Sequence, residues 1–327
     1  MTRVAVIGSG NIGRRHLTVL KRLPSVQPLA VPVREARVPE LLAEEFEVAR
    51  DIGEARQQGC THCVVATDTG RHFQDAIAAA ENGMDLLVEK PLSVDAGEAA
   101  ALQARVATAG QQLFVGCVLR FSESLNTFRE LQDRIGRPHS ARIECQSHLP
   151  GWRRDRSYQE SYSARVDEGG VLRDLIHEID YAGWLLGWPG SVQAKLRNLD
   201  RLGIGAEETA TLLWETKSGW AVTMTLDYLS RPARRRMRVA GEFGTIEWDG
   251  IEQSVTLALT GKPVEVRASE QTRDEMLLAQ DRAFVEGSGD DSFGPMAKAE
   301  GGVRALSVCD AARRASNSGS EETVRYR

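Results

Sequence analysis

The stretch "VAVIGSGNIGRRH", Val4 to His16, decides the fold expected for this chain. Its apolar start predicts a buried strand, and three glycines follow with the G-x-G-x-x-G spacing of a dinucleotide-binding turn. Gly8 would let the chain turn tightly, Gly10 would let the backbone approach a pyrophosphate, and Gly13 would let the next helix pack closely against the strand. The motif therefore predicts a dinucleotide site at the first turn.

The helix after this turn would present backbone N–H groups to the anion, those of Asn11 and Ile12 among them. Further short apolar runs recur downstream, with helical patterns between most of them: Leu29 to Val33, Cys63 to Thr67, Leu86 to Val88 and Leu113 to Leu119. This alternation predicts right-handed crossovers and a parallel sheet covered on both faces. Residues 1–120 are therefore expected to form a doubly wound α/β Rossmann domain.

The totals of the sequence limit its class. A chain of 327 residues suggests about two domains. Hydrophobic residues are 42% and charged residues 27%, the balance of a folded soluble protein. No apolar run approaches the ~20 residues of a membrane span. Met1 to Arg3 leads directly into the first strand without a signal peptide, so a cytoplasmic protein without membrane partners is expected.

The charge pattern disfavours nucleic acid as a partner. The formal net charge is -5, which gives no general attraction to polyanions. The run "RPARRRMR", Arg231 to Arg238, holds five arginines but continues into an alternating strand. A phosphate contact, or salt bridges across a subunit interface, explains this run better than nucleic-acid binding.

The cysteines predict neither a disulfide framework nor a metal site. Five cysteines are spread through the chain. Cys60 and Cys63 have the spacing of a redox or metal motif, but no second pair lies nearby. Cys63 also begins an apolar run in which a small buried residue suits a strand.

The end of the second predicted strand bears on the choice of cofactor. An acidic residue there would bind the free ribose 2'-hydroxyl of NAD, but Val33 occupies that position. Arg34 and Arg37 follow, and an arginine is a natural partner for the 2'-phosphate of NADP. NADP is therefore favoured over NAD, while Glu35 keeps NAD open.

The stretch "DLLVEKPLS", Asp85 to Ser93, predicts an oriented lysine. The apolar residues indicate a buried strand, and Lys90 lies where that strand should leave the sheet. Pro91 fixes its own backbone and restricts the preceding Lys90 to an extended conformation. The ammonium group is therefore expected to point in one direction, as a catalytic group must.

The stretch "DEGGVLRDLIHEIDYAGWLLGWPG" predicts a single helix from Gly169–Gly170 to about Gly187. One side of it is apolar, and a second stripe recurs at spacings of three and four: Asp174, His177, Tyr181 and Trp184. His177 titrates near neutrality, which suits it to take a proton from a hydroxyl. A buried structural histidine, capped by Asp174 or Asp180, is the alternative.

Together these segments resemble a known family, the oxidoreductases grouped around glucose-fructose oxidoreductase and inositol dehydrogenase, often called Gfo/Idh/MocA. The resemblance covers nearly the whole chain. It is carried by "GSGNIGRRH", "ATDTGRH", "EKP", "LRF" and "GGVLRDLIHEID".

The resemblance implies that Lys90, Asp174 and His177 face the nicotinamide, and that Pro91 follows a cis peptide bond. One departure affects Asp174. Many members separate the aspartate and the histidine by four positions, whereas Asp174 and His177 are three apart and Arg173 occupies the position four before the histidine.

The matching motifs extend the expected site. Thr67, His72 and Glu89 are expected to contribute to the cofactor site. Arg120 of "LRF" is expected to contact the substrate.

Residues 121–327 are expected to form an α+β substrate and oligomerisation domain with a large, mainly antiparallel open sheet. Its predicted strands are Ala141 to Ser147, Val192 to Leu199, Thr209 to Glu215, Ala221 to Tyr228, Met237 to Ala240, Thr245 to Trp248 and Val255 to Leu259. Two helices are expected after about Thr272. The resemblance implies that one face of the sheet pairs with a second subunit, in a homodimer or homotetramer.

A long irregular stretch before the His177 helix, "HLPGWRRDRSYQESYSARVDEGG", predicts a functional loop. Its aromatic and basic residues suit a sugar or an anionic nucleotide sugar, and those expected to bind it are Trp152, Arg153, Tyr158 and Tyr162.

The sequence therefore predicts an NAD(P)-dependent dehydrogenase of a sugar or sugar derivative that needs no metal. Two alternatives stay open: a regulator that senses a dinucleotide without catalysis, and a redox-neutral enzyme that recycles a tightly bound cofactor.

Overall fold

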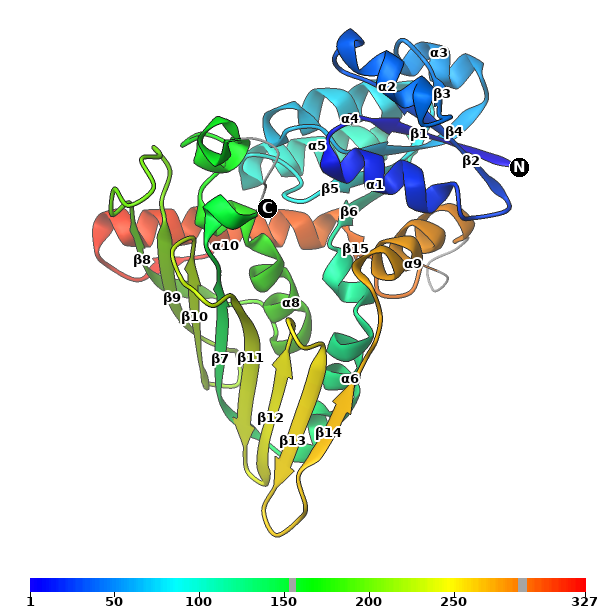
Figure 1. Cartoon of the computed structure of the whole chain (residues 1–327). Coiled ribbons are helices and arrows are strands. Elements are labelled where there is room, and N and C mark those ends of the chain that lie inside the picture. The colour runs from blue at the N-terminus through cyan, green and yellow to red at the C-terminus, as the bar shows by residue number, and fades with distance from the viewer. Residues whose placement is uncertain (153–156, 288–292) are drawn as a thin grey trace. The chain divides into compact units, whose positions relative to one another are not determined.

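The computed structural model describes residues 1–152, 157–287 and 293–327 (Figure 1). By its internal contacts the chain divides into two compact units. Unit 1 comprises Met1–Phe121 and Thr272–Val303, and unit 2 comprises Ser122–Gln271 and Arg304–Arg327. The first division falls beside the expected boundary at residue 120. The segment Thr272–Val303, expected within the second domain, packs with unit 1 because its helix contacts the first helix of the chain.

Unit 1 is built on a seven-stranded sheet in the order β15-β6-β5-β4-β1-β2-β3. All neighbouring strands are parallel except β15, which pairs antiparallel with β6. The strands are β1 (Thr2–Ile7), β2 (Val26–Val31), β3 (Glu47–Val48), β4 (Cys60–Val65), β5 (Asp85–Glu89), β6 (Leu113–Gly116) and β15 (Ala297–Lys298). The helices are α1 (Asn11–Leu20), α2 (Val38–Ala43), α3 (Ile52–Gln57), α4 (His72–Glu81), α5 (Ala96–Thr108) and α9 (Arg273–Glu286). This arrangement confirms the predicted Rossmann fold.

The core of unit 1 explains why these runs become strands. Val4 and Val6 of β1 are fully buried and pack with Leu17 of α1 and Phe284 of α9 in one apolar cluster. A central parallel strand has both faces covered, so a continuous apolar run suits it.

Three strand predictions in unit 1 were wrong in extent. β4, expected from Cys63 to Thr67, runs from Cys60 to Val65. β2 begins at Val26, which pairs with Thr2, and ends at Val31. Pro32 follows and lacks the N–H that would continue the ladder. β6 ends at Gly116 and a 3-10 helix takes over at Val118–Phe121, so the chain leaves the sheet earlier than its apolar run suggests.

Unit 2 is built on a nine-stranded sheet in the order β14-β13-β12-β11-β7-β10-β9-β8-β16. Its strands are β7 (Pro138–Gln146), β8 (Ser191–Arg197), β9 (Thr209–Glu215), β10 (Ala221–Asp227), β11 (Arg234–Gly241), β12 (Gly244–Asp249), β13 (Ser254–Leu259), β14 (Glu265–Ala268) and β16 (Glu322–Thr323). Its helices are α6 (Glu123–Leu131), α7 (Val171–Asp174), α8 (Ile176–Leu186) and the greater part of α10 (Ala299–Ser318), which begins in unit 1.

The mainly antiparallel sheet is confirmed, but it is not a simple meander. β7 lies between β10 and β11 and runs parallel to β10. Consecutive strands β10 and β11 are thus separated by a strand from much earlier in the chain, which local sequence patterns do not report. Trp248 of β12 packs edge-on against Tyr181 of α8 and donates its indole N–H to Ser124 of α6, so these two helices contact the same face of the sheet.

The single helix predicted over Gly170 to Gly187 was wrong. The structure has two helices, α7 and α8, with a break at Leu175, where ψ is 30°. The hydrogen-bond ladder stops and restarts there: the N–H of Leu175 bonds to Val171, and the N–H of Glu178 bonds to Leu175.

Among the described residues, no helix has both the length and the apolar character needed to cross a bilayer.

Candidate active site

The glycine turn of unit 1 has the geometry that a dinucleotide requires. A Cβ atom on Gly8, whose φ is +98°, would lie 2.6 Å from the carbonyl oxygen of Ala66, and one on Gly13 would lie 2.0 Å from that of Gly8. Both glycines are therefore needed by the packing itself. Gly10 differs, because it is exposed and a Cβ there would meet no atom within 4 Å. The turn thus leaves open the position where a phosphate group would approach.

The first turn of α1 supplies donors beside Gly10. The N–H of Arg14 bonds to the carbonyl of Gly10 at 2.9 Å and starts the helical ladder. The N–H groups before it have no acceptor within the helix and are available to an anion. Asn11 is exposed, whereas Ile12 packs against the core and contributes only its backbone. These residues fit a pyrophosphate.

Lys90 follows directly after the last residue of β5, as the sequence predicts, and the Lys90–Pro91 peptide bond is cis, as the resemblance implies. Its side chain is half-buried. The carbonyl oxygen of Pro91 lies 2.9 Å from Nδ1 of His72, and Nε2 of His72 lies 3.1 Å from the carbonyl oxygen of Thr67. His72 thus ties the chain after β5 to the chain after β4.

His72 is buried, and burial lowers the pKa of its ring despite the hydrogen bonds to both carbonyls. A neutral imidazole carries a single N–H, so it donates to one of the two carbonyl oxygens and packs against the other. Direct contact of His72 with the cofactor stays a prediction.

A second polar cluster lies at the end of β4. The hydroxyl of Thr67 donates to Oδ2 of Asp75 at 2.9 Å, and Arg71 binds both oxygens of the same carboxylate. The Thr67 hydroxyl is therefore oriented by a buried partner. Sequence reasoning missed Asp75. Its position in the first turn of α4 was a signal, because a carboxylate there can face back toward the end of β4.

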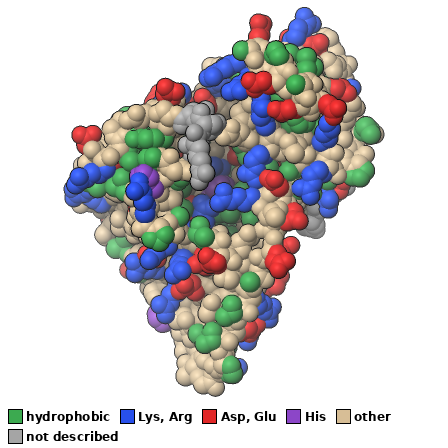
Figure 2. Space-filling model, viewed as in Figure 1, with side chains coloured by type: hydrophobic (Ala, Val, Ile, Leu, Met, Phe, Trp, Pro, Cys, Tyr) green, Lys and Arg blue, Asp and Glu red, His purple; other side chains and the backbone are tan. Residues whose placement is uncertain are grey.

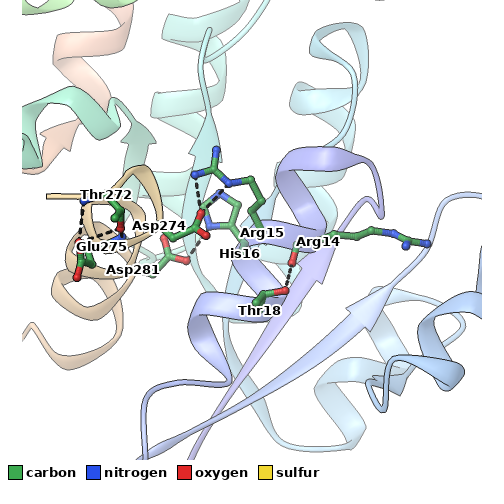
Figure 3. Close-up of polar contacts among 8 residues, drawn as sticks. All are labelled: Arg14, Arg15, His16, Thr18, Thr272, Asp274, Glu275 and Asp281. Carbon is green, nitrogen blue, oxygen red and sulfur yellow. Dashed lines mark hydrogen bonds and ion pairs between the residues drawn. The ribbon is translucent and has the colours of Figure 1, made fainter. Parts of the chain in front are cut away.

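Glu89, expected at the cofactor, is part of a buried trio. Its Oε1 lies 3.1 Å from Nε2 of His16, and Nδ1 of His16 lies 2.7 Å from Oδ2 of Asp281. Figure 3 shows His16 and Asp281 pointing toward one another from α1 and α9. Sequence reasoning missed both residues. The position of His16, three residues after Gly13, was a signal, whereas Asp281 gave none.

Arg120 and Arg34 complete the predicted residues of unit 1. Arg120 is buried in the 3-10 helix over Val118–Phe121. Arg34 is exposed, three residues after the end of β2. A substrate contact for Arg120 and a phosphate contact for Arg34 stay predictions.

In unit 2, Asp174 is buried at the end of α7 and its two oxygens accept different tyrosine hydroxyls. Tyr162 donates to Oδ1 at 2.7 Å, and Tyr228 donates to Oδ2 at 2.9 Å. Burial and the charge of Asp174 hold the pKa of Tyr228 well above its ordinary value, so Tyr228 is a permanent donor. Asp174 thus joins the predicted substrate loop to the end of β10.

His177 lies in the first turn of α8 and is half-buried. The helix break at Leu175 separates it from Asp174, so the two residues lie on two helices instead of the single helix predicted. Arg173, four before the histidine, is buried and donates to the carbonyl of Asp167 at 2.5 Å. Burial lowers the pKa of Arg173, and the charge of Arg313 adds to this effect.

The other aromatic residues of the predicted loop are also fastened to unit 2. Tyr158 donates to the carbonyl of Leu202 at 3.0 Å. Trp152 donates to the hydroxyl of Ser147 at 2.9 Å and meets the ring of Tyr228 edge-on. Arg153 lies outside the described residues. Substrate contacts of all four loop residues stay predictions.

The basic run at Arg231 to Arg238 forms ion pairs within unit 2. Arg235 of β11 binds the fully buried Glu178 at 2.8 Å, and Arg236 binds Asp249 at 2.8 Å. Figure 2 shows basic and acidic side chains intermixed on the visible face.

Cys60 and Cys63 are free and buried. Burial raises the pKa of the Cys60 thiol to about 11, and it raises the pKa of Cys63 as well. These shifts disfavour the thiolate that metal binding or redox chemistry requires. Within residues 1–152, 157–287 and 293–327, no three His, Cys, Asp or Glu side chains form a metal-binding group.

Comparisons with known proteins match both units. Residues 2–117 match the family model described as oxidoreductase family, NAD-binding Rossmann fold, and residues 128–247 match the GFO/IDH/MocA C-terminal domain. Inositol 2-dehydrogenase from Acidiphilium cryptum is 31% identical over 233 residues, which cover 66% of this chain and 64% of that protein. Myo-inositol dehydrogenase Hyg17 from Streptomyces leeuwenhoekii is 30% identical over 189 residues, which cover 56% of this chain and 55% of that protein. The chain thus spans between about half and two thirds of these curated relatives.

A solved structure of levoglucosan dehydrogenase in complex with NADH and L-sorbose superposes with a TM-score of 0.87. The match covers 100% of this chain and 99% of that chain, at 18% identity. At that identity the match supports the fold alone.

Proposed function

Because the chain belongs to the GFO/IDH/MocA family of oxidoreductases, we propose that it is a nicotinamide-dependent dehydrogenase of a sugar or polyol. The observation that carries the proposal is the glycine turn, where Gly10 faces open space beside the donors of α1. The curated relatives named for inositol support a polyhydroxylated substrate. When bound, the dinucleotide accepts or supplies the hydride.

The chain's own residues handle the proton and the charge on the reacting oxygen. His177 takes the proton of the substrate hydroxyl in oxidation and returns it in reduction. Lys90 donates a hydrogen bond to the same oxygen and stabilises the negative charge that develops there. Asp174 contributes by holding Tyr162 and Tyr228 in place, since both its oxygens accept their hydroxyls.

The backbone of the first turn binds the pyrophosphate. Gly10 and the N–H groups of Asn11 and Ile12 lie at the N-terminus of α1, where the helix dipole favours an anion. The oriented hydroxyl of Thr67 lies at the end of the adjacent strand β4, at the carboxyl edge where cofactors bind such sheets.

The dinucleotide is NAD(H) or NADP(H). NADH is named with the solved relative, which supports NAD(H). Arg34, exposed after β2, supports NADP(H) through a contact with the 2'-phosphate. Competition between NADH and NADPH for the purified protein decides between them.

As the substrate class, a neutral polyol or sugar is favoured over an anionic or nucleotide sugar. Three arginines of the predicted loop fall in residues 153–156, outside the described part of the chain, and the fourth, Arg165, already binds Glu168. The curated relatives named for inositol support the neutral class of substrate. A homo-oligomer stays part of the proposal, because the family resemblance implies that one face of the sheet in unit 2 pairs with a second subunit.

The proposal is tested by denaturing a sample to detect cofactor that co-purified, and then titrating the protein with NADH and NADPH while following their fluorescence. A panel of inositols and aldoses with NAD or NADP follows, with reduced nicotinamide as the readout. Binding and reduction support the dehydrogenase. A tightly retained cofactor with no net reduction supports recycling instead, and binding without any turnover supports a sensor.

A further inference from the structure

We propose that His16 and Asp281 are positioning residues that hold the carboxylate of Glu89, and through it the strand end that carries Lys90. The inference rests on the proposed function of Lys90 and assigns a task to the segment Thr272–Val303, which returns to unit 1. It concerns residues of unit 1 alone.

The geometry is a relay of three side chains from three elements. His16 of α1 is fully buried, with Glu89 of β5 at 3.1 Å on one ring nitrogen and Asp281 of α9 at 2.7 Å on the other. Asp281 is itself fully buried. Because the carboxylate oxygens accept, the ring donates at both nitrogens and is held in one orientation.

The adjacent strand β6 leaves space for the side chain of Glu89. Glu89 and Gly116 are register partners on β5 and β6. A Cβ atom at Gly116 would lie 2.7 Å from Oε1 of Glu89, so only glycine leaves room for the carboxylate there. The side chain is therefore confined by His16 and by the backbone of β6.

The trio carries a buried charge. Burial by itself lowers the pKa of His16, but the charge of Asp281 and the hydrogen bonds that the ring donates to Asp281 and Glu89 outweigh this and raise the pKa to about 10. Burial raises the pKa of Asp281, against the charge of His16. With a carboxylate at each ring nitrogen, His16 holds the proton. Buried ionic groups often stabilise no more than apolar residues of the same volume, so fixing a geometry explains the trio better than stability does.

These contacts restrict the backbone of Lys90, because both residues next to it in the chain are held by hydrogen bonds. Glu89 is held by His16, and the carbonyl of Pro91 is held by His72. The lysine side chain thus starts from a backbone that cannot shift independently of α1, α4 and α9. His16 lies one turn after the glycine motif, so the same helix connects the pyrophosphate donors with the position of Lys90.

The test compares two aspartates of α9. Asp281→Asn replaces the carboxylate that pairs with His16 by a neutral amide of nearly the same shape, which should weaken that contact. Asp274→Asn is the matched control, because Asp274 also connects α9 to α1, through Arg15 at 2.7 Å, but at the surface (Figure 3). We expect Asp281→Asn to lower kcat by about tenfold to a hundredfold, as small misplacements of catalytic groups do. We expect the affinity for NADH to be retained, and Asp274→Asn to match the wild type.

A readout without cofactor separates this inference from the proposed function. Amide hydrogen exchange of residues 85–92 in the free protein should be faster in Asp281→Asn than in Asp274→Asn. If the wild type oxidises nothing but the exchange difference appears, the proposed function fails while the clamp on the strand end stands. Equal exchange in the two variants would contradict the proposed role of His16 and Asp281, whether or not the wild type oxidises a substrate.

Two further variants extend the test, and the first of them also covers a failure of Asp281→Asn to fold. Gly116→Ala displaces Glu89 without removing a charge, and it should show the same loss of kcat and faster exchange. The double variant Glu89→Gln with Asp281→Asn should lose no more activity than Glu89→Gln alone, because both changes break one relay. Wild-type kcat in Gly116→Ala, or losses that add in the double variant, would overturn the proposal.

Discussion

The hydroxyl of Tyr162 donates to Oδ1 of Asp174 at 2.7 Å, which fastens the loop before the His177 helix to the end of α7. Tyr228 donates to the other oxygen of the same carboxylate from the residue after β10. Asp174 therefore connects a loop, a helix and a strand of unit 2. In the proposed mechanism the two residues, three apart in sequence, have separate tasks: His177 takes the proton, and Asp174 holds Tyr162 and Tyr228.

Tyr162→Phe should destabilise unit 2 by about 1–3 kcal/mol, because it removes a hydrogen bond to a buried carboxyl group. Urea unfolding measures the loss. Tyr158→Phe is the control, since its hydroxyl donates to the neutral carbonyl of Leu202 and its loss should cost about 0.5–1.5 kcal/mol. Equal costs for the two variants would contradict the role of Asp174.

Gly10→Ala and Gly13→Ala should separate binding from folding. An alanine at Gly10 meets no atom within 4 Å, so the protein should keep its melting temperature and lose affinity for NADH. An alanine at Gly13 lies 2.0 Å from the carbonyl of Gly8, so the fold itself should be lost or strongly destabilised. Thermal melting and fluorescence titration check both. Unchanged affinity in Gly10→Ala would remove that residue from the cofactor site.

The stability of the protein should depend on pH through His16. Its folded pKa of about 10 lies above the ordinary value of 6.5, so the stability it adds is fully present below pH 6.5 and is lost as the pH rises through 10. Relative to His16→Gln, the free energy of unfolding of the wild type should therefore fall across this range. His139→Gln, at an exposed position of β7, should follow the wild type. A parallel course of wild type and His16→Gln would show that His16 is neutral.

If Lys90 stabilises the charge that develops in the transition state, as proposed, Lys90→Met should lower kcat by about a hundredfold to a thousandfold while the affinity for NADH is retained. Steady-state kinetics with the best substrate of the panel provides the measurement. Lys21→Met, which removes an exposed lysine of the same unit, is the control. Full turnover in Lys90→Met would exclude the lysine from the mechanism.

Arg34→Gln should affect the two dinucleotides differently. If Arg34 binds the 2'-phosphate, the variant loses affinity for NADPH and keeps its affinity for NADH, since only NADPH carries that group. Fluorescence titration of wild type and variant with both dinucleotides gives the ratio. An equal effect on both, or none on either, would end the case for NADP(H).

The first unit was predictable because its signals are local. Gly8 and Gly13 are required within a few residues of where they occur, and the apolar strands of a parallel sheet are recognisable one by one. The ends of the strands were harder to predict. Pro32 ends β2 because proline lacks the N–H that would continue the ladder, and Val26 belongs to β2 only because it pairs with Thr2.

The second unit and the polar clusters depend on distant contacts. The parallel pairing of β7 with β10 and the break at Leu175 have no local sequence signal. Asp281 contributes to unit 1 from 265 residues after His16, so no spacing rule could connect them. The motif residues Lys90 and His177 were found by pattern, whereas the contacts of His16 with Asp281 and with Glu89, next to Lys90, were found only in the structure.

The most direct test of the central claim is a transfer experiment with a polyol that carries deuterium on its carbinol carbon, incubated with the wild-type protein and the preferred dinucleotide. Mass spectrometry of the nicotinamide then reports whether the deuterium has moved. We expect deuterium in the reduced nicotinamide of the wild type and a greatly slowed transfer in Lys90→Met. Bound dinucleotide that never acquires deuterium from any inositol or sugar would contradict the account and identify the protein as a binding protein.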